Sequence, residues 1–300
     1  MNKVVRCEYE AWEIETLLDT YNFTREDFLI KKAIVKFENL KKYTNKEGGL
    51  MMSNLDKRVW IGENGLAAWG SLRLYELTKK DKFYNQAKIW LNYIIKNPVI
   101  KRKDQPRLYL VFLAWNNYAL IKMAETSGEK YWKNLAIKYS KELIKAQKTL
   151  GNWSICFHYD YYVAQSLLFT YSHFKKNNKY LTLSLDCFKA TRKFIDNTRH
   201  TKTIFTKLRP IHYFVPIASG YTSLQHSHTC FSMFLETFNV DDFLEGEISF
   251  LNVKRYLLKD GKVLKQKGDK KGNDLATIWL KRAESYRNRC KDILVKENLI

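Results

Sequence analysis

The chain has 300 residues, 45% of them hydrophobic and 28% charged, and its 52 Lys and Arg against 31 Asp and Glu give a formal net charge of +21. This apolar content excludes a largely disordered chain and is enough for a large core. The longest stretch without Lys, Arg, Asp or Glu, residues 210–235, carries three His, several Ser and a Gln, which argues against a transmembrane helix.

The N-terminal residues MNKVVRCEYEAWEIE place four Glu where a signal peptide needs its apolar region. The five Cys are scattered and form no C-x-x-C pair, so the sequence predicts neither a disulfide framework nor a zinc knuckle. We therefore expect a cytoplasmic protein that has no metal ion and no cofactor.

Gly and Pro are scarce, at 12 and 4 residues, where average usage gives roughly 21 and 15. Few tight turns and strand ends are available, so the chain is predicted to be mostly helical. Residues 9–21 and 25–44 are the first predicted helical hairpin.

Three amphipathic, Lys-rich segments then align on Lys82, Lys130 and Lys179, which are 48 and 49 residues apart. Each follows a segment of very low charge, at residues 64–77, 108–125 and 157–174. A helix that is apolar nearly all round is buried, whereas a helix with a charged stripe lies at the surface. The repeat is therefore predicted to be a hairpin of one inner and one outer helix.

Residues 217–238 have the low charge of a further inner helix, which makes about five hairpins. Asp260-Gly261 between two short apolar runs predicts a small β-hairpin, and a last helix is expected over residues 273–297. We expect a single domain over 1–300, with a leading hairpin at 1–50, core repeats at 60–240, and the ribbon and closing helix at 241–300.

Such hairpins stack either as an open superhelix or as a closed ring. The ring is favoured because the inner helices lack a solvent face. The segment ENGLAAWGSLRLYELTKKDKFYNQAKIWLNYI resembles repeats of six-hairpin carbohydrate enzymes, a group that includes unsaturated glucuronyl hydrolases and N-acylglucosamine 2-epimerases. The resemblance implies an all-α fold, the α/α toroid, with a sugar pocket at one mouth of the barrel.

A second resemblance is to terpenoid cyclases and protein prenyltransferases, which share the toroid. KAQKTLGNWS is similar to their Q-x-x-x-G-x-W repeat, with Gln147, Gly151 and Trp153 in the matching places. Their D-x-D-D motif is absent, and Asp241-Asp242 only approaches a metal-binding D-D-x-x-D pattern. The sugar-enzyme resemblance is therefore the stronger one.

Charges on buried inner helices need an explanation, because an unpaired buried ion is costly. Asp160 lies among aromatic residues at the start of one inner helix, and Glu63 has the corresponding place in an earlier repeat. A pair of carboxylates is what glycoside hydrolysis requires, so Glu63 and Asp160 are the candidate catalytic pair. The alternative is that both are first-turn acids which the helix dipole favours.

Histidines are the other catalytic candidates. His226 and His228 lie two residues apart, so on a regular helix they point in different directions and cannot bind one metal ion. Their H-x-H segment resembles the His-containing helix of the 2-epimerases, which implies proton exchange beside a sugar carbonyl. His158 and His212 could serve equally well, and the alternative for all four is a polar lining or an ordinary core position.

Aromatic, amide and guanidinium groups near the inner helices could bind a sugar by stacking, hydrogen bonds and ion pairs. The alternative is ordinary core packing or internal hydrogen bonding. The substrate-binding candidates are Trp60, Trp69, Arg107, Trp115, Asn116, Trp153, Tyr161, His212 and Gln225.

The positive charge is centred on the repeats and the C-terminal segment, and it would attract an anionic partner. No nucleic-acid motif is present, so an acidic polysaccharide is favoured over a specific nucleic acid. We expect a carbohydrate-active hydrolase, lyase or epimerase acting on an anionic oligosaccharide. The alternatives are a non-catalytic helical scaffold with a basic surface and a terpenoid or prenyl enzyme.

Overall fold

The computed structural model describes residues 5–98, 106–149, 157–174, 179–184, 186, 220–264 and 272–298. The chain forms two compact units. The first comprises Met1–Tyr21, Arg25–Asn152 and Ser166–Thr182, and the second comprises Asn22–Thr24, Trp153–Gln165 and Leu183–Ile300. The single domain expected over 1–300 stays a prediction.

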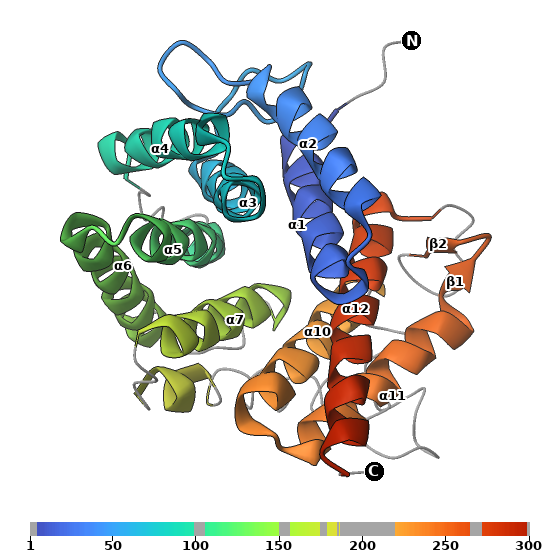
Figure 1. The fold of residues 1–300 in the computed structure, drawn as a ribbon. Coiled ribbons are helices and arrows are strands. Elements are labelled where there is room, and N and C mark those ends of the chain that lie inside the picture. The colour runs from blue at the N-terminus through green and yellow to red at the C-terminus, as the bar shows by residue number, and fades with distance from the viewer. Residues whose placement is uncertain are drawn as a thin grey trace. The chain divides into compact units, whose positions relative to one another are not determined.

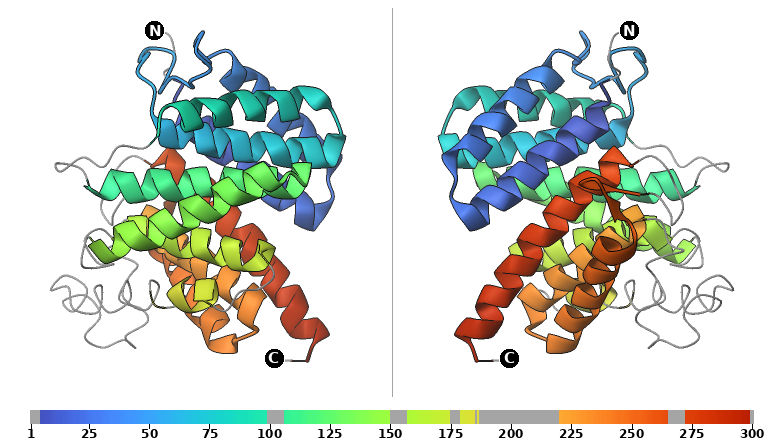
Figure 2. Two further views of the ribbon diagram at one scale, coloured as in Figure 1. Left: turned by 90° about the vertical axis from the view of Figure 1, so that its left-hand side faces the viewer. Right: turned by 90° about the vertical axis from the view of Figure 1, so that its right-hand side faces the viewer.

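The first unit is built from helical hairpins (Figures 1 and 2). The inner helix α3 packs against its outer partner α4 and against the next inner helix α5, which in turn packs against α6. The predicted alternation of inner and outer helices is therefore confirmed here. The helices are α1 (Cys7–Thr24), α2 (Asp27–Lys41), α3 (Ile61–Thr78), α4 (Asp81–Lys96), α5 (Pro106–Ser127), α6 (Lys130–Thr149) and the C-terminal half of α7 (Phe157–His173).

The burial pattern follows from the sequence period. Nearly every residue of α3 from Gly62 to Leu72 is buried, as expected of a helix with almost no charged side chains. In α4, by contrast, burial is confined to one stripe that includes Phe83, Trp90 and Ile94. The Lys-rich stripe of such a helix is left for solvent.

The same short turn joins inner and outer helices in four hairpins. Arg25, Lys79, Gly128 and Phe238 all have positive φ angles, of 60°, 55°, 69° and 56°. Each donates its backbone N–H to the carbonyl four residues earlier, over 2.7–3.1 Å, and the outer helix begins two residues later. Because three of the four are not Gly, the scarcity of Gly is compatible with these turns, at a cost of roughly 1–2 kcal/mol each.

The second unit contains α10 (Gly220–Thr237), α11 (Val240–Tyr256), a two-stranded antiparallel sheet and α12 (Asp274–Lys296) (Figure 1). Helix α10 packs against both α11 and α12. Strands β1 (Leu258–Lys259) and β2 (Lys262–Val263) pair through the turn at Asp260-Gly261, so the predicted β-hairpin is confirmed.

Helix α11 is absent from the sequence-based prediction, although its ends carry ordinary signals. The Asn239 side chain accepts a hydrogen bond from the backbone N–H of Asp241, and Asp241 and Asp242 lie in the first turn. Lys254 and Arg255 lie in the last turn, where the helix dipole favours cations. These acids therefore begin a helix, which accounts for the D-D pattern without a metal. In the described part of the chain, every helix is too short or too polar to cross a membrane.

Candidate functional site

The loop between α2 and α3 brings the start of α3 into the interior. On α3, the Asn64 side chain accepts a hydrogen bond from the Leu50 backbone N–H over 2.8 Å and donates one to the Trp60 carbonyl over 3.0 Å. These two bonds hold the loop against the first turn of the helix. Glu63 precedes Asn64 and is 3% exposed.

The same loop also holds the start of α1. The Cys7 backbone N–H donates to the Met52 carbonyl over 3.0 Å, and the Val5 N–H donates to the Asn54 side chain over 2.9 Å. Asn54 returns a backbone hydrogen bond to the Val5 carbonyl. The first turn of α1, which contains Glu8, is therefore fixed by the same loop that is bonded to Asn64, the residue after Glu63.

Glu8 and Glu63 form what we term the acid pair. Burial raises the pKa of Glu63 well above its usual value, and the negative charges of Glu8 and Asp56 raise it further against the opposing charge of Arg6. Burial also raises the pKa of Glu8 to about 7, although Arg6 and a hydrogen bond from Trp12 act in the other direction. Within the described residues, Glu63 Oε2 is buried without a hydrogen-bond partner. The pair is therefore protonated at pH values where ordinary carboxylates are ionised.

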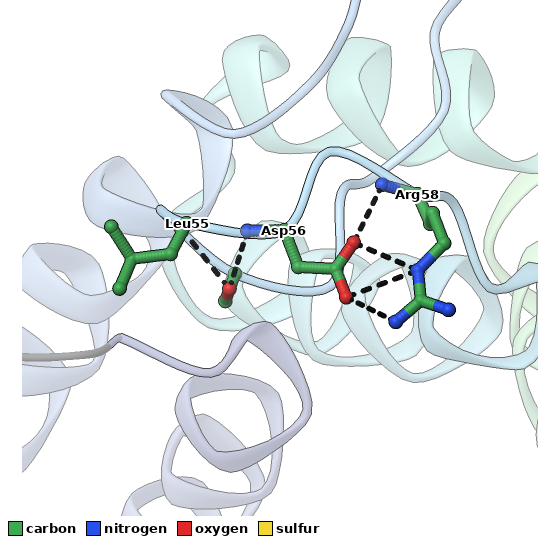
Figure 3. A network of polar contacts seen from close by, with 4 residues as sticks. Leu55, Asp56 and Arg58 are labelled. Atoms are coloured by element: carbon green, nitrogen blue, oxygen red, sulfur yellow. Dashed lines mark hydrogen bonds and ion pairs between the residues drawn. The ribbon is translucent and has the colours of Figure 1, made fainter.

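Asp56 differs from the acid pair because its carboxylate is hydrogen-bonded within the loop (Figure 3). Its backbone N–H and that of Leu55 both donate to the Ser53 hydroxyl. Its carboxylate accepts from the Arg58 side chain, with a shortest N–O distance of 2.6 Å. These hydrogen bonds from Arg58 lower the pKa of Asp56 to about 2. Asp56 therefore contributes a fixed negative charge, while Glu63 keeps its proton.

Aromatic side chains of the first unit pack mainly on each other. Trp115 meets Trp12 edge to face at 5.9 Å between ring centroids. Trp69 is 6% exposed and stacks on Tyr118 at 4.8 Å. Trp69 and Trp115 therefore belong to the core, the alternative left open by the sequence. Trp60, directly before α3, is only half-buried.

The two neighbouring asparagines of α5 have different environments. Asn117 donates to the hydroxyls of Ser166 and Thr170 over 3.0 and 3.1 Å and accepts from Ser140 over 3.2 Å. Asn116 is 0% exposed, and neither atom of its amide has a hydrogen-bond partner within the described part of the chain. Asn117 is thus a structural residue, and Asn116 retains unused hydrogen-bonding capacity.

In the second unit, His228 is a buried polar side chain without hydrogen-bond partners in the described chain, as Asn116 is in the first unit. Its ring lies 4.2 Å from the ring of Tyr286 and 5.3 Å from that of Trp279, both on α12. It is 3% exposed, and neither ring nitrogen has a partner among the residues described. Burial lowers the pKa of His228 well below its ordinary value, and the charge of Arg282 lowers it further. The imidazole is therefore neutral.

His226 points to a different helix from His228, as their spacing predicts. Its Nε2 atom lies 3.0 Å from Glu245 of α11 and 3.5 Å from the sulfur of Cys230. Gln225 precedes it and is fully buried, with no partner for its amide oxygen or nitrogen in the described chain.

Several predicted site residues remain untested. Trp153 and His212 lie outside the described residues. The backbones of Arg107, His158, Asp160 and Tyr161 lie in the first turns of α5 and α7, but their side chains are not among those described. The pairing of Glu63 with Asp160 therefore stays a prediction.

Sequence reasoning missed three residues, namely Glu8 of the acid pair in the first unit, and Arg282 and Tyr286 beside His228 in the second unit. For Glu8 a signal existed, because it lies in the first turn of α1, as Glu63 does in α3. Arg282 and Tyr286 lie on an amphipathic helix with many charged residues, where nothing local distinguishes them.

The fold is similar to that of solved sugar enzymes. A cellobiose 2-epimerase from Spirochaeta thermophila has a TM-score of 0.71 and 10% identity, over 97% of this chain and 87% of that one. A D-mannose isomerase has a TM-score of 0.70 and 10% identity, over 98% and 88%. A GH76 α-mannanase from Bacteroides thetaiotaomicron has a TM-score of 0.67 and 14% identity, over 97% and 88%.

No protein-family model matches the chain, and no curated protein matches it. The structural similarities establish the fold class as predicted, an all-α fold of the six-hairpin glycosidase-like α/α-toroid type with a small β-hairpin.

Proposed function

We propose that this protein is a carbohydrate-active enzyme that cleaves an oligosaccharide by acid–base chemistry. The observation that carries the proposal is the acid pair, in which Glu63 is buried and protonated and its Oε2 atom has no hydrogen-bond partner in the described chain. The similarity of the fold to a GH76 α-mannanase supports it.

Glycoside hydrolysis needs one carboxylic acid that protonates the leaving oxygen and one carboxylate that activates water or attacks the sugar. Glu63 suits the first role because burial and neighbouring negative charges keep its proton in place. Either Glu8 or Asp160 would supply the second carboxylate. Glu8 is favoured because its raised pKa, about 7, places it near neutrality as a proton acceptor.

The substrate is proposed to be anionic, such as an oligosaccharide that contains uronic acid. The net charge of +21 supports this choice, since it raises the local concentration of polyanions. Arg107, in the first turn of α5, is the proposed ligand of a substrate carboxylate. Trp60 and Asn116 are the proposed stacking and hydroxyl-binding groups of the same unit.

The test incubates the protein with a panel of neutral and uronic-acid oligosaccharides and uses NMR to detect the cleavage products. Glu63→Gln should lower kcat by at least 100-fold, because loss of a general acid typically costs 10²–10⁴-fold. Glu8→Gln and Asp160→Asn identify the second carboxylate, and Glu47→Gln removes an exposed loop carboxylate as a control. Full activity of a folded Glu63→Gln variant would reject Glu63 as the general acid. No turnover of any sugar by the wild type would reject the hydrolase and favour a non-catalytic scaffold.

A second candidate is a sugar epimerase or isomerase, and His228 is the observation that favours it. A buried imidazole with two unpartnered ring nitrogens in the described chain, near a cationic Arg282, is suited to move a proton beside a carbonyl. The similar folds of a cellobiose 2-epimerase and a D-mannose isomerase support this candidate.

The two candidates differ in a simple measurement. An epimerase or isomerase exchanges a sugar C–H proton with solvent deuterium, whereas a hydrolase cleaves a glycosidic bond and leaves that proton in place. The experiment incubates mannose, glucose and cellobiose with the protein in D₂O and follows C2–H by NMR. Exchange that is lost in His228→Gln and kept in Glu63→Gln would establish the second candidate, and its absence for all three sugars would speak against it.

A further inference from the structure

A second polar cluster lies between α10 and α11, within the second unit. His226 and Cys230 are four residues apart on α10 and so share one face of the helix. Glu245 faces them from α11, and all three side chains are buried. Their ligand atoms lie within 4.8 Å of one another.

Two of the three separations between these ligand atoms are close to the edges of a tetrahedral metal site. Zn–N and Zn–O bonds of about 2.0–2.1 Å and a Zn–S bond of about 2.3 Å give ligand–ligand separations of about 3.3–3.6 Å. Here the Cys230 sulfur lies 3.5 Å from His226 Nε2, and the Glu245 oxygen lies 3.0 Å from the same nitrogen. The Glu245 oxygen and the Cys230 sulfur lie within 4.8 Å of one another, and a shift of the carboxylate would complete the geometry.

Ser249 provides an independent observation. It lies one turn beyond Glu245 on α11, and its hydroxyl is 0% exposed with no hydrogen-bond partner in the described part of the chain. A water bound to the metal as fourth ligand would give such a hydroxyl its partner.

We propose that His226, Cys230 and Glu245 bind one divalent cation of the zinc type, which ties α10 to α11. The nitrogen, sulfur and oxygen donors are those that Zn²⁺ takes in proteins, whereas Mg²⁺ and Ca²⁺ prefer oxygen alone. The site belongs to the second unit and shares no residue with the acid pair, and it departs from the sequence-based expectation that the protein binds no metal.

The test uses the full chain, freed of metal with a chelator and titrated with Co²⁺ as a spectroscopic substitute for Zn²⁺. One equivalent of Co²⁺ should bind with a thiolate-to-cobalt charge-transfer band, and one equivalent of Zn²⁺ should displace it. Cys230→Ser should lose the band, while Cys290→Ala, which removes another buried thiol of the same unit, should keep it. Added Zn²⁺ should raise the Tm of the wild type and of Cys290→Ala.

Absence of a Co²⁺ thiolate band in the wild type would overturn the proposal, as would an unchanged band in Cys230→Ser. If Cys230→Ser fails to fold, Glu245→Gln serves in its place, because it keeps the thiol and the side-chain volume. It should retain the band but bind Co²⁺ more weakly, and an unchanged affinity would remove Glu245 from the site and overturn the three-ligand proposal.

Discussion

The raised pKa of Glu8 predicts how stability depends on pH. A pKa of about 7 in the folded protein, against an ordinary value of 4.5, means that the folded state holds this proton more tightly than the unfolded state. Between these two values the unfolded chain loses the proton while the folded chain keeps it. The free energy of unfolding should therefore decrease as pH rises, by about 1.4 kcal/mol per pH unit, and level off above the folded pKa.

The total effect of Glu8 is about 3 kcal/mol at most, because the side chain retains some contact with solvent. Glu8→Gln has no proton to lose, so at pH 8 it should be more stable than the wild type by up to this amount. Glu63→Gln should act in the same direction. Since the charge of Glu8 raises the pKa of Glu63, the double variant should gain less than the sum of the two single variants.

The assay is urea unfolding followed by tryptophan fluorescence at pH 5, 6, 7 and 8. Glu47→Gln is the matched control, because it removes a carboxylate that is exposed in the loop between α2 and α3. The wild type and this control should show the same pH slope, and Glu8→Gln a smaller one. Equal slopes for the wild type and Glu8→Gln would refute the reasoning, since Glu8 would then ionise in the folded protein as it does in the unfolded chain.

Two further substitutions test the polar contacts of the inner helices by the same unfolding assay. Asn117→Ala removes three buried hydrogen bonds and should lower stability by about 3 kcal/mol; a loss below 1 kcal/mol would contradict the network. Arg73→Leu removes the guanidinium that pairs with Glu15 and with Asp19, the latter at 2.8 Å. It should cost about 3–5 kcal/mol, and a loss below 1 kcal/mol would argue against a buried ion pair at this position.

The helices were predictable because their signals are local. The period of apolar residues separates α3 from α4 without any knowledge of what they contact. Helix α11 was missed even though Asn239 caps it, because Asp241-Asp242 was interpreted as a possible metal motif. A capping residue followed by acids and, one helix length later, by Lys254 and Arg255 is evidence for a helix in its own right.

The site was only partly predictable, because burial of a charged residue depends on distant parts of the chain. Glu63 was identified because it is a charged residue at the start of an apolar inner helix, in the place that corresponds to Asp160 of a later repeat. Glu8 is half-buried, and its helical turn is held by a loop that begins more than 30 residues later in the sequence, through hydrogen bonds of Cys7 with Met52 and of Val5 with Asn54. No periodicity in residues 1–24 reveals these contacts, and nothing in the local sequence distinguishes Glu8 from the other Glu residues of α1.

The adjacent amides of α5 allow a last test of where a ligand binds. Leaving a buried polar group without a partner costs about 1–3 kcal/mol, and Asn116 bears this cost while Asn117 does not. Asn116→Leu keeps a similar volume and should raise stability by about 1–2 kcal/mol, whereas Asn117→Leu should lower it. If Asn116 is kept for a substrate hydroxyl, the stabilised variant should also show a raised KM. A loss of stability in Asn116→Leu would mean that the amide is satisfied within the protein, and unpartnered polar groups on α5 would then not mark the substrate site.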